Sequence, residues 1–488
     1  MYSLLRKHLF PLLAVLTMAG GALLPAPATS GEQADRAVAA VQKLLASGHV
    51  APGTRLHLGF KQGNIDAFLG RDLTLQKEWE NLTGIVLDAQ IVPQQSVRQT
   101  LQNDTGVDIT VARNHEYPDL LAEGLVTDLT PLYAEYGFQL DDNATDGFIR
   151  PDLQAWVGER AVAIPADGDI VLLYLRRDLL DSPQEQAAFR KTYGRALAAP
   201  KTWAEYEDLL RFFHRPTQGL YGCAEERDQE GAWMYWMPRF LSATSPYQAL
   251  FDAQMRPLLD TPVGVAATES YIAAVKYSAP GTTDNGRGYN FVLPLFAQGK
   301  AFATIFTVAG AKLFNGEGSA VRGKFITVAI PGYRHGGQLL HRNTPIYGNN
   351  LVIPKSAKNA KLAFLYAMWL TDPDISARSI GVTGGFADPY RWSHLRDARI
   401  REIYTAEALE TFAGEWATTL PAGTGLRGDG DYLAALDRNL TAAARGEIGA
   451  HEAMKRTSAE WEAITERLGR AEQVRQWQAS RKRPGGRS

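Results

Sequence analysis

The chain contains 488 residues, with 51 Lys and Arg against 53 Asp and Glu and a formal net charge of −2. This balance argues against a nucleic-acid-binding protein and against a protein that coats anionic membranes. A chain of this length is too large for one compact core, so two domains are expected. The single cysteine, Cys223, excludes an intramolecular disulfide, and we expect it to be a small buried apolar residue.

Residues 1–28 predict a secretory signal peptide. Arg6 and Lys7 precede an uncharged apolar run from Leu9 to Leu24, and Ala26-Pro-Ala28 offers the small-x-small cleavage pattern. A membrane anchor is the alternative, but the run is short for a span and is interrupted by a proline and two glycines. Because no cysteine lies near the cleavage site, we expect a soluble protein without a lipid anchor, exported to the periplasm of a Gram-negative cell.

Strand and helix patterns alternate over the first quarter of the chain. The expected strands cover residues 55–60, 86–92 and 108–112, and the expected helices cover 33–47, 73–82, 96–102 and 118–124. This order predicts an α/β fold with a mainly parallel sheet covered by helices.

A hinge is predicted within residues 161–180. Pro165 ends one strand, and Gly168 can absorb a change in backbone dihedral angles before a buried strand resumes. Further along, Thr202 and Glu205 have the spacing of a capping box at the start of a helix.

The C-terminal third continues the alternation. Strand patterns that end at Pro or Gly lie in residues 299–306, 322–332 and 348–356, an amphipathic helix is predicted over 359–372, and two more helices are predicted over 431–444 and 451–467. The basic end of the chain, 480–488, predicts a frayed polar tail.

Enzyme signatures are scarce. The sequence contains no His-Glu-x-x-His, no Gly-x-Ser-x-Gly and no cysteine pair, and its nine histidines are scattered. Gly423–Gly428 matches a dinucleotide-binding spacing, but no predicted strand leads into it. Residues 141–147 hint at a calcium loop, but the glycine is misplaced and no glutamate ends the loop. We therefore predict no catalytic site, no metal site and no cofactor.

The order of these elements resembles the bacterial extracellular solute-binding proteins of family 1, the sugar-type receptors of ABC importers. The resemblance extends over about residues 54–469 and is carried by the segments 161–180, 200–207, 299–332, 348–372 and 431–467. It implies a type II periplasmic-binding-protein fold, with two α/β lobes joined by a multi-crossing hinge. The implied divisions are lobe I at 54–165 plus 332–380, lobe II at 166–331 plus 381–470, and a disordered basic tail at 471–488.

The resemblance also implies a function. A monomeric periplasmic receptor would bind a sugar, oligosaccharide or polyol between its lobes, close about hinges near Pro165, Pro331 and Gly381, and deliver the ligand to membrane permease subunits. Many sugar-binding relatives carry a tryptophan after the strand at 299–306, where this chain has Phe306 and no tryptophan follows until Trp369. An amine or a phosphorylated metabolite is therefore an alternative ligand, and a periplasmic hydrolase is an alternative function.

Candidate ligand-binding residues follow from the rule that a cleft ligand meets polar groups at strand ends and aromatic faces. The polar candidates are Lys61, Gln62, Asn64, Arg113, Asn114, His115, Asp167, Asp169, Tyr347, Asn349 and Asn350. The aromatic candidates are Trp233, Tyr235, Trp236, Phe306 and Tyr432. Gly385, Phe386 and Arg391 are added because their segment resembles a loop that often lines the cleft in the family. For each polar candidate, a loop side chain that faces water is the competing interpretation.

Overall fold

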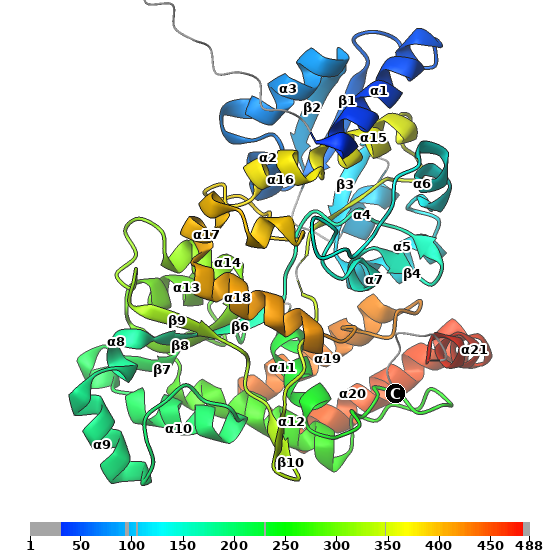
Figure 1. Ribbon diagram of the computed structural model, residues 1–488. Coiled ribbons are helices and arrows are strands. Elements are labelled where there is room, and N and C mark those ends of the chain that lie inside the picture. Colours follow the sequence, from blue (N-terminus) through cyan, green and yellow to red (C-terminus); the bar gives the residue numbers. More distant parts are fainter. Residues whose placement is uncertain (1–30, 93–96, 104–105, 229–230, 347, 482–488) are drawn as a thin grey trace, which may run out of the picture.

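Two lobes, each built on a four-stranded sheet covered by helices, make up the computed structural model (Figure 1). The structure describes residues 31–92, 97–103, 106–228, 231–346 and 348–481. The predicted signal peptide therefore lies outside the described residues. None of the helices within the described ranges is both long enough and apolar enough to cross a bilayer. The predicted fold of two α/β lobes is confirmed.

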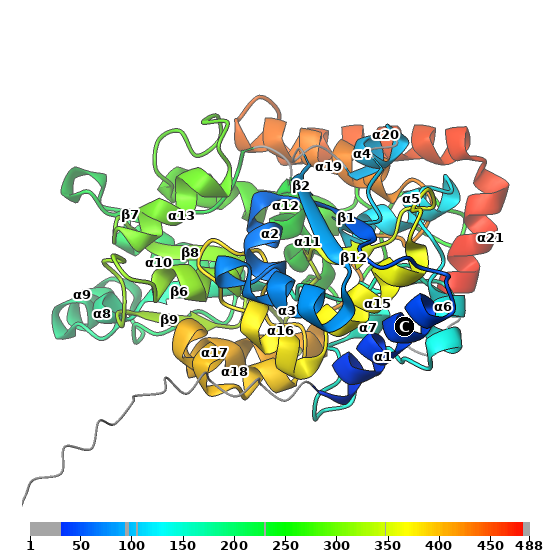
Figure 2. The ribbon, with the colours of Figure 1, turned by 90° about the horizontal axis from the view of Figure 1, so that it is seen from above.

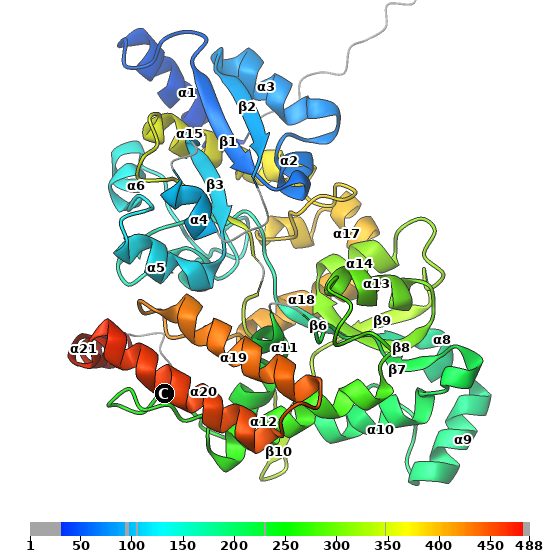
Figure 3. The same cartoon turned by 180° about the vertical axis from the view of Figure 1, so that it is seen from behind.

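Lobe I contains the parallel sheet predicted from the first quarter of the chain. Its strand order is β12-β3-β1-β2, with β12 antiparallel to β3 and the others parallel. The strands are β1 (Arg55–Phe60), β2 (Val86–Ile91), β3 (Ile109–Ala112) and β12 (Asn350–Val352). Their helices are α1 (Glu32–Ala46), α2 (Gln62–Phe68), α3 (Thr74–Thr83), α4 (Val97–Gln102), α5 (Tyr117–Ala122), α6 (Thr130–Tyr136), α7 (Pro151–Gln154), α15 (Ala360–Leu370) and α16 (Pro373–Ser379), with a short hairpin of β4 (Trp156–Val157) and β5 (Arg160–Ala161). The parallel strands point toward lobe II (Figure 3).

Lobe II has the strand order β7-β8-β6-β9, with β6 antiparallel to both of its neighbours. The strands are β6 (Val171–Arg176), β7 (Tyr221–Cys223), β8 (Ala301–Thr307) and β9 (Phe325–Val328), with a hairpin of β10 (Tyr333–His335) and β11 (Gln338–Leu340). The helices are α8 (Arg177–Leu180), α9 (Pro183–Tyr193), α10 (Trp203–Phe213), α11 (Ala232–Ser242), α12 (Pro262–Ala273), α13 (Tyr289–Ala297), α14 (Ala309–Phe314), α17 (Ala398–Tyr404), α18 (Ala406–Glu415), α19 (Asp429–Ala444), α20 (Ala450–Leu468) and α21 (Arg470–Arg481). The capping box at the start of α10 and the burial of Cys223 are both as predicted.

The chain crosses between the lobes three times. The first two crossings run antiparallel, with bridges that pair Ile164 with Leu351 and Ile170 with Pro345. The third crossing follows α16, and its backbone bonds to lobe I as far as Trp392, whose N–H donates to Gly147 O, before α17 begins on lobe II. The predicted multi-crossing hinge is therefore confirmed.

The lobe boundary predicted after residue 331 is wrong. Gly332 forms a parallel bridge with Thr202 of lobe II, and the β10–β11 hairpin follows on the same lobe (Figure 1). The second crossing begins only near Pro345. The strand β9 ends at Val328, three residues before Pro331, and the backbone then finds partners in lobe II instead of leaving it.

The helix predicted over 359–372 as amphipathic is buried on every side. All nine residues from Leu362 to Leu370 of α15 are buried, because α1 covers the face turned away from the sheet. The rings of Trp79 and Trp369 lie 5.3 Å apart in the core of lobe I. The sequence pattern could not show that α1, from more than 300 residues earlier in the chain, packs against this helix.

The prediction of a disordered tail from residue 471 is wrong up to residue 481. These residues form most of α21, which turns away from the end of α20 along the edge of the molecule (Figure 2). Trp477 anchors this helix, since it is only 8% exposed and its Nε1 donates to Asp252 O at 2.9 Å. Residues 482–488 lie outside the described residues.

Candidate functional site

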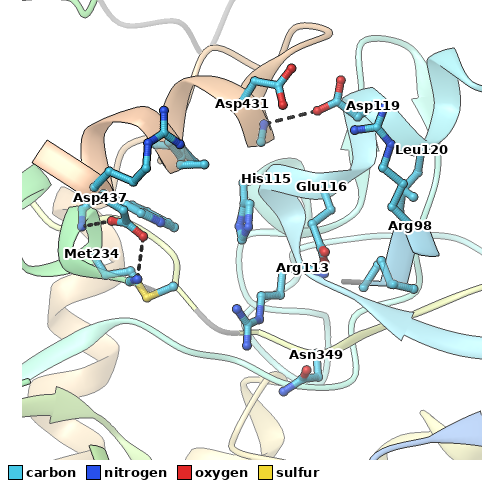
Figure 4. Close-up of a pocket in the computed structure, with 18 of the residues that line it drawn as sticks. Arg98, Arg113, His115, Glu116, Asp119, Leu120, Met234, Asn349, Asp431 and Asp437 are labelled. Atoms are coloured by element: carbon cyan, nitrogen blue, oxygen red, sulfur yellow. Dashed lines mark hydrogen bonds between the residues drawn. The ribbon is translucent and has the colours of Figure 1, made fainter. Parts of the chain in front are cut away.

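A cavity of about 740 Å³ lies between the two lobes (Figure 4). Both lobes contribute charged and polar side chains to its lining. Asn349, which lies in the second crossing, also lines the cavity. The polar lining residues of lobe I include Lys61, Arg98, Arg113, His115, Glu116 and Asp119, and those of lobe II include Asp431, Asp437, Arg438, Arg445 and Glu447. A molecule in this cavity would contact both lobes.

Part of the lobe I wall is built from residues that follow the carboxyl ends of its strands. Lys61 follows β1, Arg113 follows β3, and His115 lies in the 3-10 turn Asn114–Glu116. Burial lowers the pKa of His115 to about 3, with a further contribution from the positive charge of Arg113. The imidazole is therefore neutral at physiological pH, and its buried Nδ1 has no hydrogen-bond partner among the described residues.

The lobe II wall consists of the first turn of α11 and one face of α19. Asp437 of α19 accepts hydrogen bonds from the backbone N–H groups of Gly231, at 2.7 Å, and Trp233, at 2.8 Å. A carboxylate at this place satisfies N–H groups that a helix leaves unpaired at its start. Asp437 therefore fixes the position of Trp233 at the cavity wall.

The two walls touch across the cavity. The rings of His115 and Trp233 meet edge to face with centroids 5.4 Å apart. This contact joins a strand-end residue of lobe I to the start of a lobe II helix. The structure therefore has its lobes closed together at this point, and the cavity lies beside the contact.

Most of the predicted aromatic residues belong to the core of lobe II instead. Trp236 is fully buried, stacks on Phe240 and donates from its Nε1 to Thr268 Oγ1 at 2.8 Å. Tyr432 packs between aromatic rings and its hydroxyl bonds to Thr465. Tyr235 is also buried, because every residue of α11 is covered by surrounding helices. Of this predicted cluster, Trp233 is the residue that the cavity reaches.

The remaining aromatic candidates do not extend the cavity wall. Phe306 ends β8, is 8% exposed and packs against Tyr289 with ring centroids 5.8 Å apart. Phe386 packs over Gly63 of α2, where an added Cβ atom would lie 2.5 Å from its ring. Gly385 belongs to the same segment and its carbonyl accepts from Lys312. Tyr347 lies outside the described residues.

Four of the predicted polar residues bond within the protein. Gln62 donates to Asp66 at 2.7 Å, and Asn64 donates to Phe386 O at 2.9 Å. The other two are Asn114, which donates to Leu153 O at 3.4 Å, and Asn350, which donates to the Tyr117 hydroxyl at 3.0 Å. None of the four lies among the residues that line the cavity.

Arg391 has a structural environment. Its guanidinium donates to Thr371 O at 2.6 Å, Asp146 O at 2.7 Å and Gln33 Oε1 at 3.0 Å. It also lies 3.8 Å above the ring of Phe148. With its donors directed to these three acceptors and 3% exposure, it holds the third crossing against lobe I rather than facing the cavity.

Asp167 and Asp169 meet Asp388 where the crossings come together. Their carboxylate oxygens lie within 4.8 Å of one another, and this is the grouping among the described residues that could offer carboxylates to a cation. Asp167, however, already accepts from Asp388 N at 2.9 Å and from Asn349 N at 3.0 Å, and Lys312 Nζ lies 3.3 Å from Asp388. The cluster therefore ties the three crossings together and lies outside the cavity lining.

From this cluster of three aspartates we predict an unusual pH dependence of the free energy of unfolding. Burial, followed by the charge of Asp388, raises the pKa of Asp167 to about 7, and burial with the charges of Asp167 and Asp388 raises that of Asp169 well above its usual value. A carboxyl whose folded-state pKa is raised stabilises the fold below its unfolded pKa, and this stability is lost as pH rises through the folded value. The free energy of unfolding should therefore fall as the pH rises from about 4 to above 7.

Replacement of Asp169 by Asn tests this dependence. Asp169 Oδ1 is buried without a hydrogen-bond partner among the described residues, so an amide removes a penalised charge and breaks no bond at that atom. We expect the Asp169→Asn variant to be more stable than the parent at pH 8 by about 1–3 kcal/mol and to show a flatter pH profile in urea denaturation. Asp152→Asn is the control, since its side chain is 59% exposed in a pair with Arg150. Lower stability of Asp169→Asn at pH 8 would contradict the account.

The family of the chain follows from comparison with known proteins. Residues 72–377, more than half of the chain, match the family model of the bacterial extracellular solute-binding proteins. The chain belongs to this family. No curated protein sequence matches this solute-binding protein significantly.

Several solved structures of similar fold contain a bound ligand, among them the following three. An ABC transporter solute-binding protein from Agrobacterium radiobacter K84, in complex with ribitol, is 19% identical, with a TM-score of 0.67 and coverage of 84% of this chain and 99% of that one. Maltose-bound MalE3 of T. maritima is 18% identical, with a TM-score of 0.67 and coverage of 84% and 100%. A D-mannitol-bound protein from Agrobacterium vitis S4 is 18% identical, with a TM-score of 0.65 and coverage of 86% and 99%. At these identities the likeness shows the fold.

Several cavity residues were missed by the sequence analysis. Arg98 and Asp119 lie on helices of lobe I, and Asp431, Asp437, Arg438, Arg445 and Glu447 lie on or just after α19. The polar positions of α19 do recur at spacings of three and four, which places them on one face of a helix. That spacing could have indicated a polar wall, but not that the wall faces lobe I.

Proposed function

We propose that this solute-binding protein is a periplasmic receptor for a sugar or polyol. The ligand occupies the cavity between the lobes and is delivered to the permease of an ABC importer. The observation that carries the proposal is the cavity itself, which both lobes line with hydrogen-bonding side chains. A ligand that contacts both lobes favours the closed arrangement, which is the form a permease can distinguish.

The composition of the wall supports a small polyhydroxylated ligand. A volume of about 740 Å³ lies in the usual range of small-molecule sites, which is about 300–1,000 Å³. Trp233 and His115 are the ring-bearing residues of the lining, whereas charged side chains are numerous. Hydroxyl groups can both donate to carboxylates and accept from guanidinium groups. The bound ribitol and D-mannitol of two fold neighbours belong to the same chemical class.

A phosphorylated polyol is the second candidate. Lys61 and Arg113 follow adjacent strands of lobe I and both line the cavity. Two cationic groups on one wall favour an anionic ligand. Hydrolysis is not part of the proposal.

A thermal-shift screen of the chain without residues 1–28 tests the proposal. Ribitol, D-mannitol, maltose, mannitol 1-phosphate and putrescine represent the polyol, sugar, phosphate and amine classes. We expect a rise in Tm with a polyol or sugar, because a ligand that binds the folded state alone stabilises it. Stabilisation by putrescine alone, or by none of the five, would contradict the proposed ligand class.

Trp233→Ala is expected to weaken binding of the stabilising compound about 10- to 100-fold, as measured by isothermal titration calorimetry. The physical reason is the loss of an apolar ring face at the cavity wall. Trp156→Ala is the matched control, since Trp156 is 37% exposed on lobe I, away from the cavity. Equal affinity in both variants would show that the ligand binds elsewhere.

A further inference from the structure

One side chain of lobe I bonds directly to the backbone of lobe II at the edge of the cavity. Asp119, on α5, accepts a hydrogen bond from Gly428 N at 2.7 Å through Oδ1 and from Gly430 N at 3.2 Å through Oδ2. Gly428 and Gly430 begin α19 of lobe II. Figure 4 shows the Asp119 carboxylate directed at the start of this helix.

The start of α19 has no cap of its own. Gly428 is the N-cap residue and has no side chain to accept from the first N–H groups, which a helix cannot pair internally. Asp429, the first helical residue, is turned back to the preceding loop, where it accepts from Thr424 N and Gly425 N, both at 2.8 Å. Asp119 is thus the side chain that caps α19, and it comes from the opposite lobe.

The contact is short, charged and shielded. Asp119 is 9% exposed, and α19 has 16 residues, so the carboxylate meets both the unpaired N–H groups and the positive end of a long helix. Burial raises the pKa of Asp119, while its bonds to Gly428 and Gly430 and the nearby Arg98 oppose that rise. Separation of the lobes would break both hydrogen bonds at once.

We propose that Asp119 is a positioning residue that sets the balance between closed and open lobes. It acts through α19, whose Asp437 in turn caps α11 and places Trp233 at the cavity wall. The cap therefore aligns the whole lobe II wall with the strand ends of lobe I. The proposal goes beyond the proposed function, since lobe closure can be measured without any ligand.

The test uses two nitroxide labels, one on each lobe, and electron-electron distance measurement on the ligand-free protein. The label sites are Gln102→Cys on α4 and Lys455→Cys on α20, both exposed. The native Cys223 is buried, and burial raises the pKa of its thiol, so it stays unlabelled. We expect Asp119→Ala to lower the ratio of closed to open populations about 2- to 30-fold, the effect of losing a helix cap. Asp119→Asn keeps one of the two acceptor oxygens and should lower the ratio less.

Asp128→Asn is the matched control. Asp128 also accepts from a backbone N–H at the start of a helix, Thr130 N at 3.0 Å, but helix α6 lies in its own lobe. We expect this variant to keep the distance distribution of the parent. Distributions of both Asp119 variants that coincide with the parent's would overturn the proposal, whether or not a ligand has been found. Failure of the ligand screen with a shifted distribution would contradict the proposed ligand and leave the role of Asp119 supported.

Discussion

Replacement of Glu225 by Gln is expected to lower the free energy of unfolding by about 3–5 kcal/mol, because it leaves buried arginines without their counter-charge. Glu225, Arg227 and Arg239 have side chains that are 0%, 0% and 1% exposed in lobe II. Glu225 accepts from Arg227 and from the Tyr206 hydroxyl, and Arg239 lies 3.9 Å away. Burial alone would raise the pKa of Glu225, but the two arginines outweigh it and hold that pKa below its usual value.

Urea denaturation at pH 7 measures this effect. The matched control is Glu410→Gln, in which a 69% exposed carboxylate loses its pairing with Arg401, at an expected cost below about 1 kcal/mol. A second variant, Glu225→Gln with Arg227→Met, should lose less than the sum of the two single changes, since they remove opposite charges from one cluster. A loss of under about 1 kcal/mol for Glu225→Gln alone would contradict this description of the cluster.

Trp369→Ala is expected to destabilise the protein by about 3–5 kcal/mol through a cavity in lobe I. The indole is fully buried on α15 and packs against Trp79 and Tyr366, with ring centroids 5.3 and 6.1 Å away. Because α1 and the sheet enclose this helix, neighbouring side chains have little room to collapse into the space.

The midpoint of urea denaturation reports the change, with Trp156→Ala as the control on the surface of the same lobe. We expect the control to lower the free energy of unfolding clearly less, because Trp156 is 37% exposed and its removal leaves no enclosed cavity. Equal losses in the two variants would mean that α15 is not the buried helix described.

The sequence was sufficient for three strands of lobe I, β1 to β3, for the helices α1, α3, α4 and α5, and for part of the cavity. Alternating strands and helices predict a parallel sheet, and the carboxyl ends of parallel strands meet along one edge. That rule identified Lys61, Arg113 and His115, which the structure brings to the cavity wall. The strand-end rule depends only on where local strand patterns end, which explains why it could identify these three residues.

The rest depends on contacts between distant parts of the chain. Trp233 and Trp236 are three residues apart on one helix, yet the surrounding helices bury the second and leave the first at the cavity. Asp437 caps α11 by bonding to Gly231, 206 residues earlier, and Asp119 caps α19 by bonding to Gly428, 309 residues later. No local spacing encodes such pairs. The ordered α21 likewise requires Trp477 to reach Asp252, 225 residues away.

The most direct test of the proposed receptor function is a crystal structure of the protein with the compound that raises its Tm most. We predict that a polyol or sugar lies in the cavity between the lobes, with direct hydrogen bonds to Arg113 or His115 on one wall and a contact with Trp233 or Asp437 on the other. A ligand bound outside this cavity, or held by one lobe alone, would contradict the account.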